Sequence, residues 1–220
     1  MNIMDIEQAR FNMIEQQIRP WDVLDIGVLN IIQSVHREDF VSKSQQNLAF
    51  ADMELPIGHG QVMMSPKVEA RMLQALEISP DDEILEIGTG SGFITACLAK
   101  MGKHVTTCEY FEDLSSIAKS RLHSHQIENI DYLTGDVFNL SDTLSSYDVI
   151  AITGSIPDQL SNTSKLLRNN GRLFCITGQA PAMTAKLITC VAENSYREES
   201  LFETVIPPLL STSTEKVFSF

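Results

Sequence analysis

Apolar residues in the N-terminal part of the chain recur every three or four positions, which is the spacing of one face of an α-helix. These stripes predict a helix over residues 4–18, ended by Arg19-Pro20, and a second helix over about 25–37. The stripe residues are Ile6, Ala9, Met13, Ile14 and Ile18, then Val28, Ile31, Ile32 and Val35. Helices in this place pack on a core or cover a binding site, and the pattern is compatible with both.

Between Phe40 and Gln61 the pattern is irregular and ends in Leu55-Pro56-Ile57-Gly58-His59-Gly60-Gln61. Long loops in compact chains are usually functional or disordered, and the aliphatic residues and few charges here argue against disorder. We therefore expect an ordered loop on the substrate side. Ser65-Pro66 then predicts a helix N-cap with proline at the first helical position. Its apolar face would carry Val68, Met72, Ala75 and Leu76.

Downstream, short apolar runs alternate with helical patterns, which is typical of a doubly wound parallel sheet. The expected strands are 83–87, His104–Glu109, Ile130–Leu133, Tyr147–Ile152 and Arg172–Thr177, with helices from about 94, over Leu114–His125 and over Gln159–Leu167. After Ala180 the runs 185–192, 201–206 and 216–220 predict an antiparallel hairpin at the sheet edge. The expected fold is α/β: a mostly parallel, Rossmann-like, seven-stranded sheet with an N-terminal helical cap.

Composition limits the classes of function. The 220 residues, 43% of them hydrophobic, fit one domain over 1–220, with helices and substrate-side loop in 1–80 and a ligand-binding core in 81–220. The formal net charge of −13 argues against a nucleic-acid partner. No apolar run has the length of a membrane span, and the N-terminus lacks the pattern of a signal peptide. We therefore expect a cytoplasmic location and no membrane partner.

The cysteines and histidines do not predict a metal site. Cys97, Cys108, Cys175 and Cys190 lie far apart in the chain, and no Cys-x-x-Cys pair is present. The five histidines show no ligand spacing either. Buried thiols and surface imidazoles are the expected arrangement.

The most informative stretch is a strand, a glycine-rich turn and a helix over residues 83–99. Glycines let a ligand approach the backbone, and the amides at a helix start point toward it. A dinucleotide-binding turn would require glycine at position 93, where Phe93 stands. The pattern Gly88-x-Gly90-x-Gly92, preceded by Glu86, instead resembles the S-adenosylmethionine loop of class I methyltransferases.

Residues at the carboxyl ends of the later strands extend this prediction, because ligands of doubly wound sheets bind at that edge. Glu109 ends the second strand, at about the 20-residue offset where an acid meets ribose hydroxyls. Asp136 follows the third strand and can accept from an adenine amino group, with Val137 packing on the ring. Thr153 begins a turn after the fourth strand that would face the reacting centre.

Nearly the whole chain resembles the protein-L-isoaspartate O-methyltransferases. The matching segments are 35–41, 51–52, 55–61, 84–92, 135–136, 147–148, 153–157, 170–173 and 206–207. The segment 57–61 before Pro66 is far more specific to this family than the glycine loop. The resemblance implies methyl transfer from S-adenosylmethionine to the carboxylate of isoaspartyl residues in damaged proteins or peptides. That carboxylate is already ionised near neutral pH, so no general base is needed.

The resemblance also implies a set of site residues. For the methyl donor these are Glu86, Gly88, Thr89, Gly90, Ser91, Gly92, Glu109, Tyr110, Asp136, Val137, Thr153, Gln61, Val62 and Met63, and the catalytic candidates are Met64, Ser65 and His59. One departure matters. The family typically has Thr-Ile-Ser where this chain has Val62-Met63-Met64, so two hydroxyl groups are replaced by apolar side chains.

Three hypotheses follow from this departure. The protein retains isoaspartyl methylation, with Ser65, His59 or backbone amides replacing the hydroxyls. Alternatively it methylates a less polar, unidentified small acceptor in a pocket shaped by Met63 and Met64. Thirdly, it binds the donor as a regulator without turnover. The intact glycine loop, with Glu109 and Asp136, favours catalysis, and the family-specific loop favours the isoaspartyl acceptor.

Overall fold

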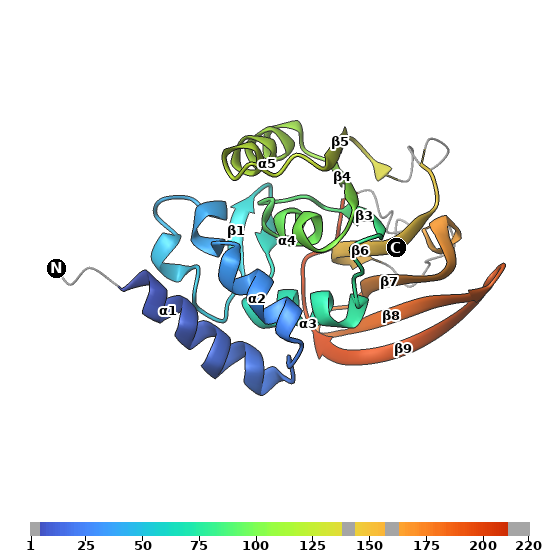
Figure 1. Cartoon of the computed structure of the whole chain (residues 1–220), viewed down its shortest axis with the longest axis horizontal. Coiled ribbons are helices and arrows are strands. Elements are labelled where there is room, and N and C mark those ends of the chain that lie inside the picture. Colours follow the sequence, from blue (N-terminus) through green and yellow to red (C-terminus); the bar gives the residue numbers. More distant parts are fainter. Residues whose placement is uncertain (1–4, 138–143, 157–162, 211–220) are drawn as a thin grey trace, which may run out of the picture.

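The computed structural model describes residues 5–137, 144–156 and 163–210 (Figure 1). Seven strands form one sheet in the order β5-β4-β3-β6-β7-β8-β9. Their bounds are β3 Glu83–Ile87, β4 His104–Glu109, β5 Ile130–Thr134, β6 Tyr147–Ile156, β7 Leu167–Gln179, β8 Ala182–Ala192 and β9 Ser195–Thr204. The pairs among β3 to β7 are parallel, whereas β8 pairs antiparallel with both β7 and β9. The predicted doubly wound sheet with an antiparallel C-terminal hairpin is confirmed.

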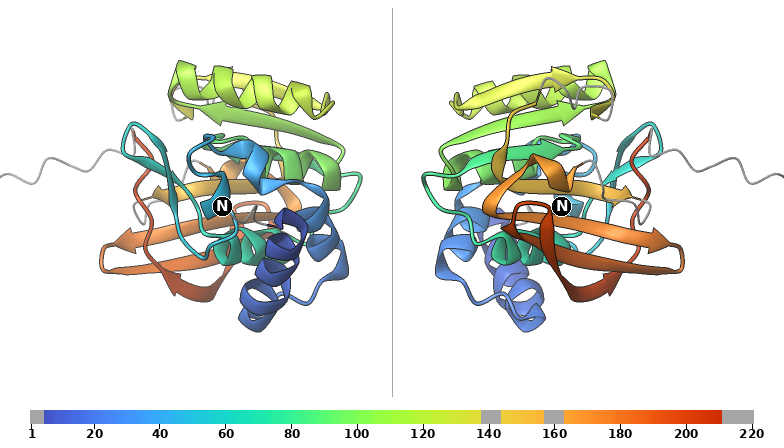
Figure 2. Two further views of the ribbon diagram at one scale, coloured as in Figure 1. Left: turned by 90° about the vertical axis from the view of Figure 1, so that its left-hand side faces the viewer. Right: turned by 90° about the vertical axis from the view of Figure 1, so that its right-hand side faces the viewer.

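Five α-helices accompany the sheet in the described residues: α1 Ile6–Met13, α2 Ile26–Ser34, α3 Pro66–Leu76, α4 Phe93–Met101 and α5 Glu112–Ser124. Asp5 and Asp25 cap α1 and α2 by accepting bonds from the amides of Gln8 and Val28. α5 runs beside β4 and β5 at one end of the sheet, and the β8–β9 hairpin forms the other end (Figure 2). α2 packs on α3 and α4, so the N-terminal helices form an outer layer.

Alternate residues of the central strands point to opposite faces of the sheet and are buried on both. Ile84 and Val149 belong to a core that includes the apolar faces of α2, α3 and α4. Leu85 and Ile150, their neighbours in sequence, belong to a second core on the other face, with residues of β7 and β8. The continuous apolar runs in the sequence reflect this double burial.

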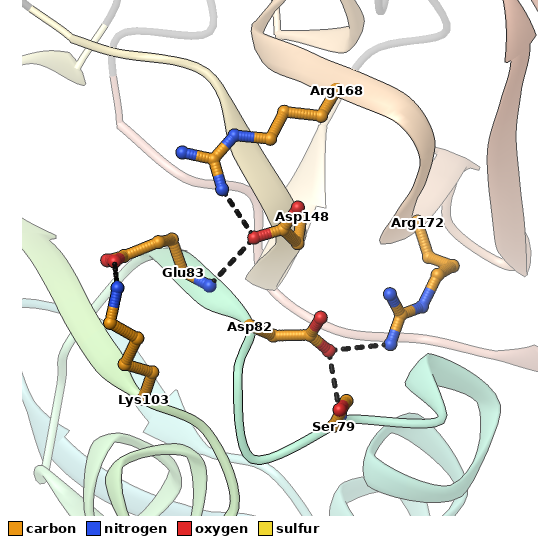
Figure 3. Close-up of polar contacts among 7 residues, drawn as sticks. All are labelled: Ser79, Asp82, Glu83, Lys103, Asp148, Arg168 and Arg172. Carbon is orange, nitrogen blue, oxygen red and sulfur yellow. Dashed lines mark hydrogen bonds and ion pairs between the residues drawn. The ribbon is translucent and has the colours of Figure 1, made fainter.

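Ion pairs occupy the edge of the sheet where the parallel strands begin (Figure 3). Asp148 at the start of β6 accepts bonds from the Glu83 amide at 2.9 Å and from Arg168 at 2.5 Å. Asp82 accepts from the Ser79 amide at 2.7 Å and from Arg172 at 2.8 Å. These contacts join the beginnings of β3, β6 and β7. They give this edge a structural role and leave the opposite, carboxyl edge for a site.

Several boundaries differ from the prediction. The first helix does not end at Arg19: the chain continues through a π-helical turn, Ile14–Ile18, and a 3-10 turn, Arg19–Trp21, before Asp22 adopts a left-handed conformation. The irregular stretch 40–61 contains the strand β1, Leu55–Gly58, which pairs with β2, Gln61–Met63. It also holds a short 3-10 turn, Gln46–Leu48, and another 3-10 turn, Arg37–Phe40, leads into it.

The prediction of a helix over 159–167 is wrong for the part of it that the structure describes, residues 163–167. Ser164–Leu166 is a 3-10 turn, and Leu167 begins β7. Thr153 does not begin a turn either, since β6 continues to Ile156 with an irregular register between Ala151 and Ser155. The predicted strand over 201–206 ends at Thr204. The predicted strand over 216–220 lies outside the described residues.

None of the helices that the structure describes is long and apolar enough to cross a membrane. The described residues contain no group of three or more histidine, cysteine, aspartate or glutamate side chains that would hold a metal ion. All four cysteines are free and buried, as predicted.

Candidate functional site

The Glu109 carboxylate links the end of β4 to the glycine loop. Its Oε2 accepts a bond from the Gly90 amide at 2.8 Å, and its Oε1 accepts from the Phe111 amide at 3.1 Å. The residue is 5% exposed. Because each carboxylate oxygen can accept more than one hydrogen bond, both oxygens retain capacity for a ligand.

The glycine loop lies close to β6 and to the β1–β2 hairpin. Gly88 has φ +96°, and a Cβ there would lie 2.5 Å from the hydroxyl oxygen of Thr153. That hydroxyl donates to the carbonyls of Ile87 and Gly88, at 3.0 and 2.5 Å. Gly90 has φ +52°, and a Cβ there would lie 3.0 Å from Ile57. Both positions therefore combine an unusual backbone conformation with a close neighbour, which favours glycine.

A solvent-open cleft of about 610 Å³ lies over the carboxyl ends of β3, β4, β5 and β6. One wall comes from these strand ends, and the other comes from the β1–β2 hairpin and the segment after β9. The lining residues are Ile57, Gln61, Val62, Ile87, Gly88, Gly90, Cys108, Glu109, Tyr110, Phe111, Leu114, Gly135, Asp136, Val137, Thr153, Leu209 and Leu210. This is the edge at which open α/β sheets bind ligands.

A second cavity of about 290 Å³ adjoins the cleft. It shares Ile57, Val62, Gly88, Gly90 and Thr153 with the cleft and adds Met63, Met64, Glu69, Thr89, Ser91 and Ile94. A third, of about 840 Å³, also reaches Ile57 and Gly90 but lies toward α5 and Arg121. The side chain of Ile57 therefore stands where three cavities meet.

The structure brings most of the predicted site residues together. Gln61, Val62, Gly88, Gly90, Glu109, Tyr110, Asp136, Val137 and Thr153 line the cleft, and Met63, Met64, Thr89 and Ser91 line the second cavity. The predicted residues that line neither are His59, Ser65, Glu86 and Gly92.

Glu86 faces the interior rather than the cleft. It is fully buried, and one carboxylate oxygen accepts from the hydroxyls of Thr95 and Thr107, both at 2.6 Å. Burial, with a smaller contribution from the charge of Glu109, raises the pKa of Glu86 to about 8, although the two hydroxyl donors act to lower it. The side chain points away from the cleft because alternate residues of β3 face opposite sides. Glu86 therefore joins β3 to α4 and β4 inside the core and does not line the cleft.

His59 turns toward α5. Its ring stacks on Phe111 with centroids 3.8 Å apart, and its Nε2 lies 2.9 and 3.0 Å from the two carboxylate oxygens of Asp113. These contacts fix the tip of the β1–β2 hairpin to the start of α5. Ser65 is the N-cap residue of α3 and Gly92 that of α4, so both shape the backbone beside the cavities.

Sequence reasoning missed an ion pair behind the second cavity. Arg37 is 1% exposed and donates to the Glu69 carboxylate at 3.0 Å, to the carbonyl of Ala49 at 2.7 Å and to that of Met64 at 2.6 Å. Leu209 and Leu210 of the cleft were missed as well. These groups meet only through the fold, and no local spacing reveals them.

Comparison with known proteins agrees with this architecture. The family model described as Protein-L-isoaspartate(D-aspartate) O-methyltransferase (PCMT) matches residues 8–211. A protein-L-isoaspartate O-methyltransferase of Protochlamydia amoebophila is 34% identical over 201 residues, covering 90% of this chain and 95% of the relative. One from a Picosynechococcus species is 40% identical over 149 residues, covering 68% of this chain and 67% of the relative.

A solved structure shares the fold. It is a Plasmodium falciparum protein described as a protein-L-isoaspartate O-methyltransferase, in complex with S-adenosyl-L-homocysteine. The TM-score is 0.76 at 19% identity, covering 92% of this chain and 97% of the other. The match of the family model over nearly the whole length, together with the two relatives, confirms the predicted assignment. The chain belongs to the protein-L-isoaspartate(D-aspartate) O-methyltransferase family.

Proposed function

We propose that the protein transfers a methyl group from S-adenosylmethionine to the carboxylate of L-isoaspartyl residues in damaged proteins or peptides. One observation carries the proposal. This chain belongs to the family, and in its cleft Glu109, Asp136 and the glycine loop lie opposite the 55–64 segment. We further expect it to act in the cytoplasm. We expect it not to act on nucleic acids, because the formal net charge is −13.

The lining residues fit the parts of the donor. Glu109 is placed to accept from the two ribose hydroxyls, with its own position fixed by the Gly90 and Phe111 amides. Asp136 and Val137 lie at the end of β5, where an acceptor and an apolar surface suit an adenine ring. Tyr110, which is 48% exposed, covers the outer part of this wall. Gly88 and Gly90 line both the cleft and the second cavity, so the rest of the donor can run past this loop from one to the other.

When bound, S-adenosylmethionine supplies a methyl group on a positively charged sulfur, which is a good leaving group. A carboxylate oxygen of the acceptor attacks the methyl carbon, the carbon–sulfur bond breaks, and its electron pair neutralises the sulfur. The protein needs no proton acceptor for this step. Its residues have to align the two substrates and exclude water, and the apolar side chains of Ile57, Val62 and Met63 are placed to do so.

A methyltransferase for a less polar acceptor is the second candidate. Met63 and Met64 are 4% and 3% exposed and line the second cavity with Val62, where the family hydroxyls are expected. An apolar wall provides no hydrogen bond for a carboxylate and favours a less polar group.

An isoaspartyl peptide incubated with methyl-labelled S-adenosylmethionine separates the candidates. The isoaspartyl activity predicts a base-labile methyl ester on that peptide and none on the same peptide with ordinary aspartate. Absence of the ester, with S-adenosylhomocysteine still bound, would contradict the isoaspartyl acceptor. Labelling of a small molecule in cell extract would then support the second candidate.

A further inference from the structure

Glu69 lies on α3, one turn after Ser65-Pro66, and is 1% exposed. Its Oε2 accepts the bond from Nε of Arg37 at 3.0 Å, and its Oε1 receives no hydrogen bond from any residue that the structure describes. Glu69 nevertheless lines the second cavity. A buried carboxylate with spare acceptor capacity therefore borders an open space, which is costly unless a donor occupies that space.

Glu69 is the only charged side chain among the described residues that line this cavity. The family hydroxyls expected on the 62–64 segment are absent, and Val62, Met63 and Met64 are apolar. Any polar ligand group entering the cavity from this side therefore meets the Glu69 carboxylate. Arg37 fixes the carboxylate through Oε2 and also holds the Met64 carbonyl at 2.6 Å, so Glu69 and the 62–64 segment are positioned together.

The amino end of α4 borders the same cavity. Gly92 is its N-cap, and Ser91 and Ile94 are among the lining residues. The first amides of a helix have no partner within it and carry partial positive charge, so they attract a carboxylate. The cavity therefore offers an anionic group on α3 and a positively polarised backbone on α4. An α-amino acid, which carries an ammonium and a carboxylate on one carbon, is complementary to both.

The cavity is also in the right place for the donor. With the ribose at Glu109, the group attached to its 5′ carbon passes the glycine loop, where the cleft and the second cavity share Gly88 and Gly90. Resting on the function proposed above, we propose that Glu69 binds the ammonium group of the donor's amino-acid portion. The amino end of α4 receives the carboxylate of the same portion.

The charge of Glu69 is consistent with this role. Burial raises its pKa, while the adjacent Arg37 guanidinium opposes that rise. An ammonium group near Oε1 favours the ionised form further. Arg37 is thus a positioning residue that keeps the acceptor in place, and Glu69 makes the contact that selects an amino-acid-bearing nucleoside over a plain one.

Binding of three nucleosides to the full chain tests the proposal by calorimetry. S-Adenosylhomocysteine carries the whole amino-acid portion and an uncharged sulfur. The analogue 5′-S-(3-carboxypropyl)-5′-thioadenosine lacks only the amino group, and 5′-methylthioadenosine lacks the whole portion. We expect the wild type to lose about tenfold or more in affinity when the amino group is removed, the scale of a charge-assisted hydrogen bond. Equal affinity for the first two nucleosides overturns the proposal without any variant.

Glu69→Gln should weaken S-adenosylhomocysteine binding by about the same factor and leave methylthioadenosine binding within about twofold. The exposed Glu128→Gln is the matched control and should change neither. Equal weakening of all three nucleosides by Glu69→Gln would indicate general damage to the cleft and overturn the proposal. If the wild type binds none of them, the proposed function itself fails, and that result does not depend on Glu69.

Discussion

The Gly90 amide donates a 2.8 Å hydrogen bond to the Glu109 carboxylate. The residue at the end of β4 therefore fixes the conformation of the glycine loop and also presents acceptor positions to the cleft. The conformation of the glycine loop and the proposed contact with the ribose therefore depend on one side chain. Substitutions at Glu109 are consequently expected to affect binding more strongly than the loss of one ligand contact alone would.

Glu109→Ala should remove most of the rise in melting temperature that S-adenosylhomocysteine produces in the wild type, because selective binding to the folded state causes that rise. Differential scanning fluorimetry over a range of ligand concentrations measures it. Glu199→Ala, an exposed acid on β9, serves as the control and should retain the full shift. A full shift in Glu109→Ala would show that the ligand does not use this strand end.

Met64→Ser should increase ester formation on an isoaspartyl peptide. The Met64 carbonyl is held by Arg37, so the backbone is expected to stay in place while a hydroxyl replaces an apolar group in the cavity. A gain of about fivefold to tenfold in kcat/KM corresponds to one hydrogen bond of about 1 kcal/mol. Met53→Ser, outside all three cavities, is the control. Unchanged or reduced activity would mean that Met64 is adapted to its present acceptor.

Asp113→Ala should loosen the β1–β2 hairpin, because it removes the partner of His59 at the hairpin tip. The His59 hydrogen bond also lowers the pKa of Asp113, so the contact is retained at neutral pH and lost in acid as the carboxylate protonates. Hydrogen exchange of amides 55–63 is expected to become faster in the variant. Glu112→Ala, on the same turn of α5, should leave it unchanged. Equal exchange rates in the wild type, Asp113→Ala and Glu112→Ala would mean that other contacts keep the hairpin ordered.

Glu86→Gln should flatten the dependence of stability on pH. With a pKa of about 8 when folded against 4.5 for the free side chain, wild-type Glu86 holds a proton that the unfolded chain has released. The folded state is therefore destabilised as pH rises from about 4.5 to 8, by at most about 1.4 kcal/mol per pH unit. Glutamine carries no such proton, yet its carbonyl still accepts from Thr95 and Thr107. Urea unfolding of both proteins between pH 5 and 8 measures the difference, and parallel curves would contradict it.

The sheet and most of the cleft could be predicted because they depend on local signals. Apolar runs mark strands buried on both faces, and parallel strands end at one edge, so Glu109, Asp136 and the glycine loop had to meet there. The wrong prediction of a helix ending at Leu167 has a different cause. The apolar residues before Leu167 are spaced as on one face of a helix. Leu167 nevertheless pairs with Tyr147 of β6, and strand pairing in the sheet overrides that spacing.

The roles of Glu86 and Glu69 could not be predicted for a related reason. Two carboxylates on apolar elements look alike in the sequence, yet one faces hydroxyls in the interior and the other borders a cavity. What separates them is contact with residues distant in the chain. Thr107 lies 21 residues from Glu86, and Arg37 lies 32 residues from Glu69.

Arg172 of β7 donates to the carbonyls of Leu76 and Glu77 at the end of α3, at 2.8 and 2.5 Å, as well as to Asp82. One guanidinium thus joins the far side of the sheet to the segment that precedes β3. A chain beginning at residue 81 would leave this cation without two of its acceptors and would expose the apolar surface that α3 covers. The N-terminal 80 residues and the sheet are therefore expected to denature together, as a single cooperative unit.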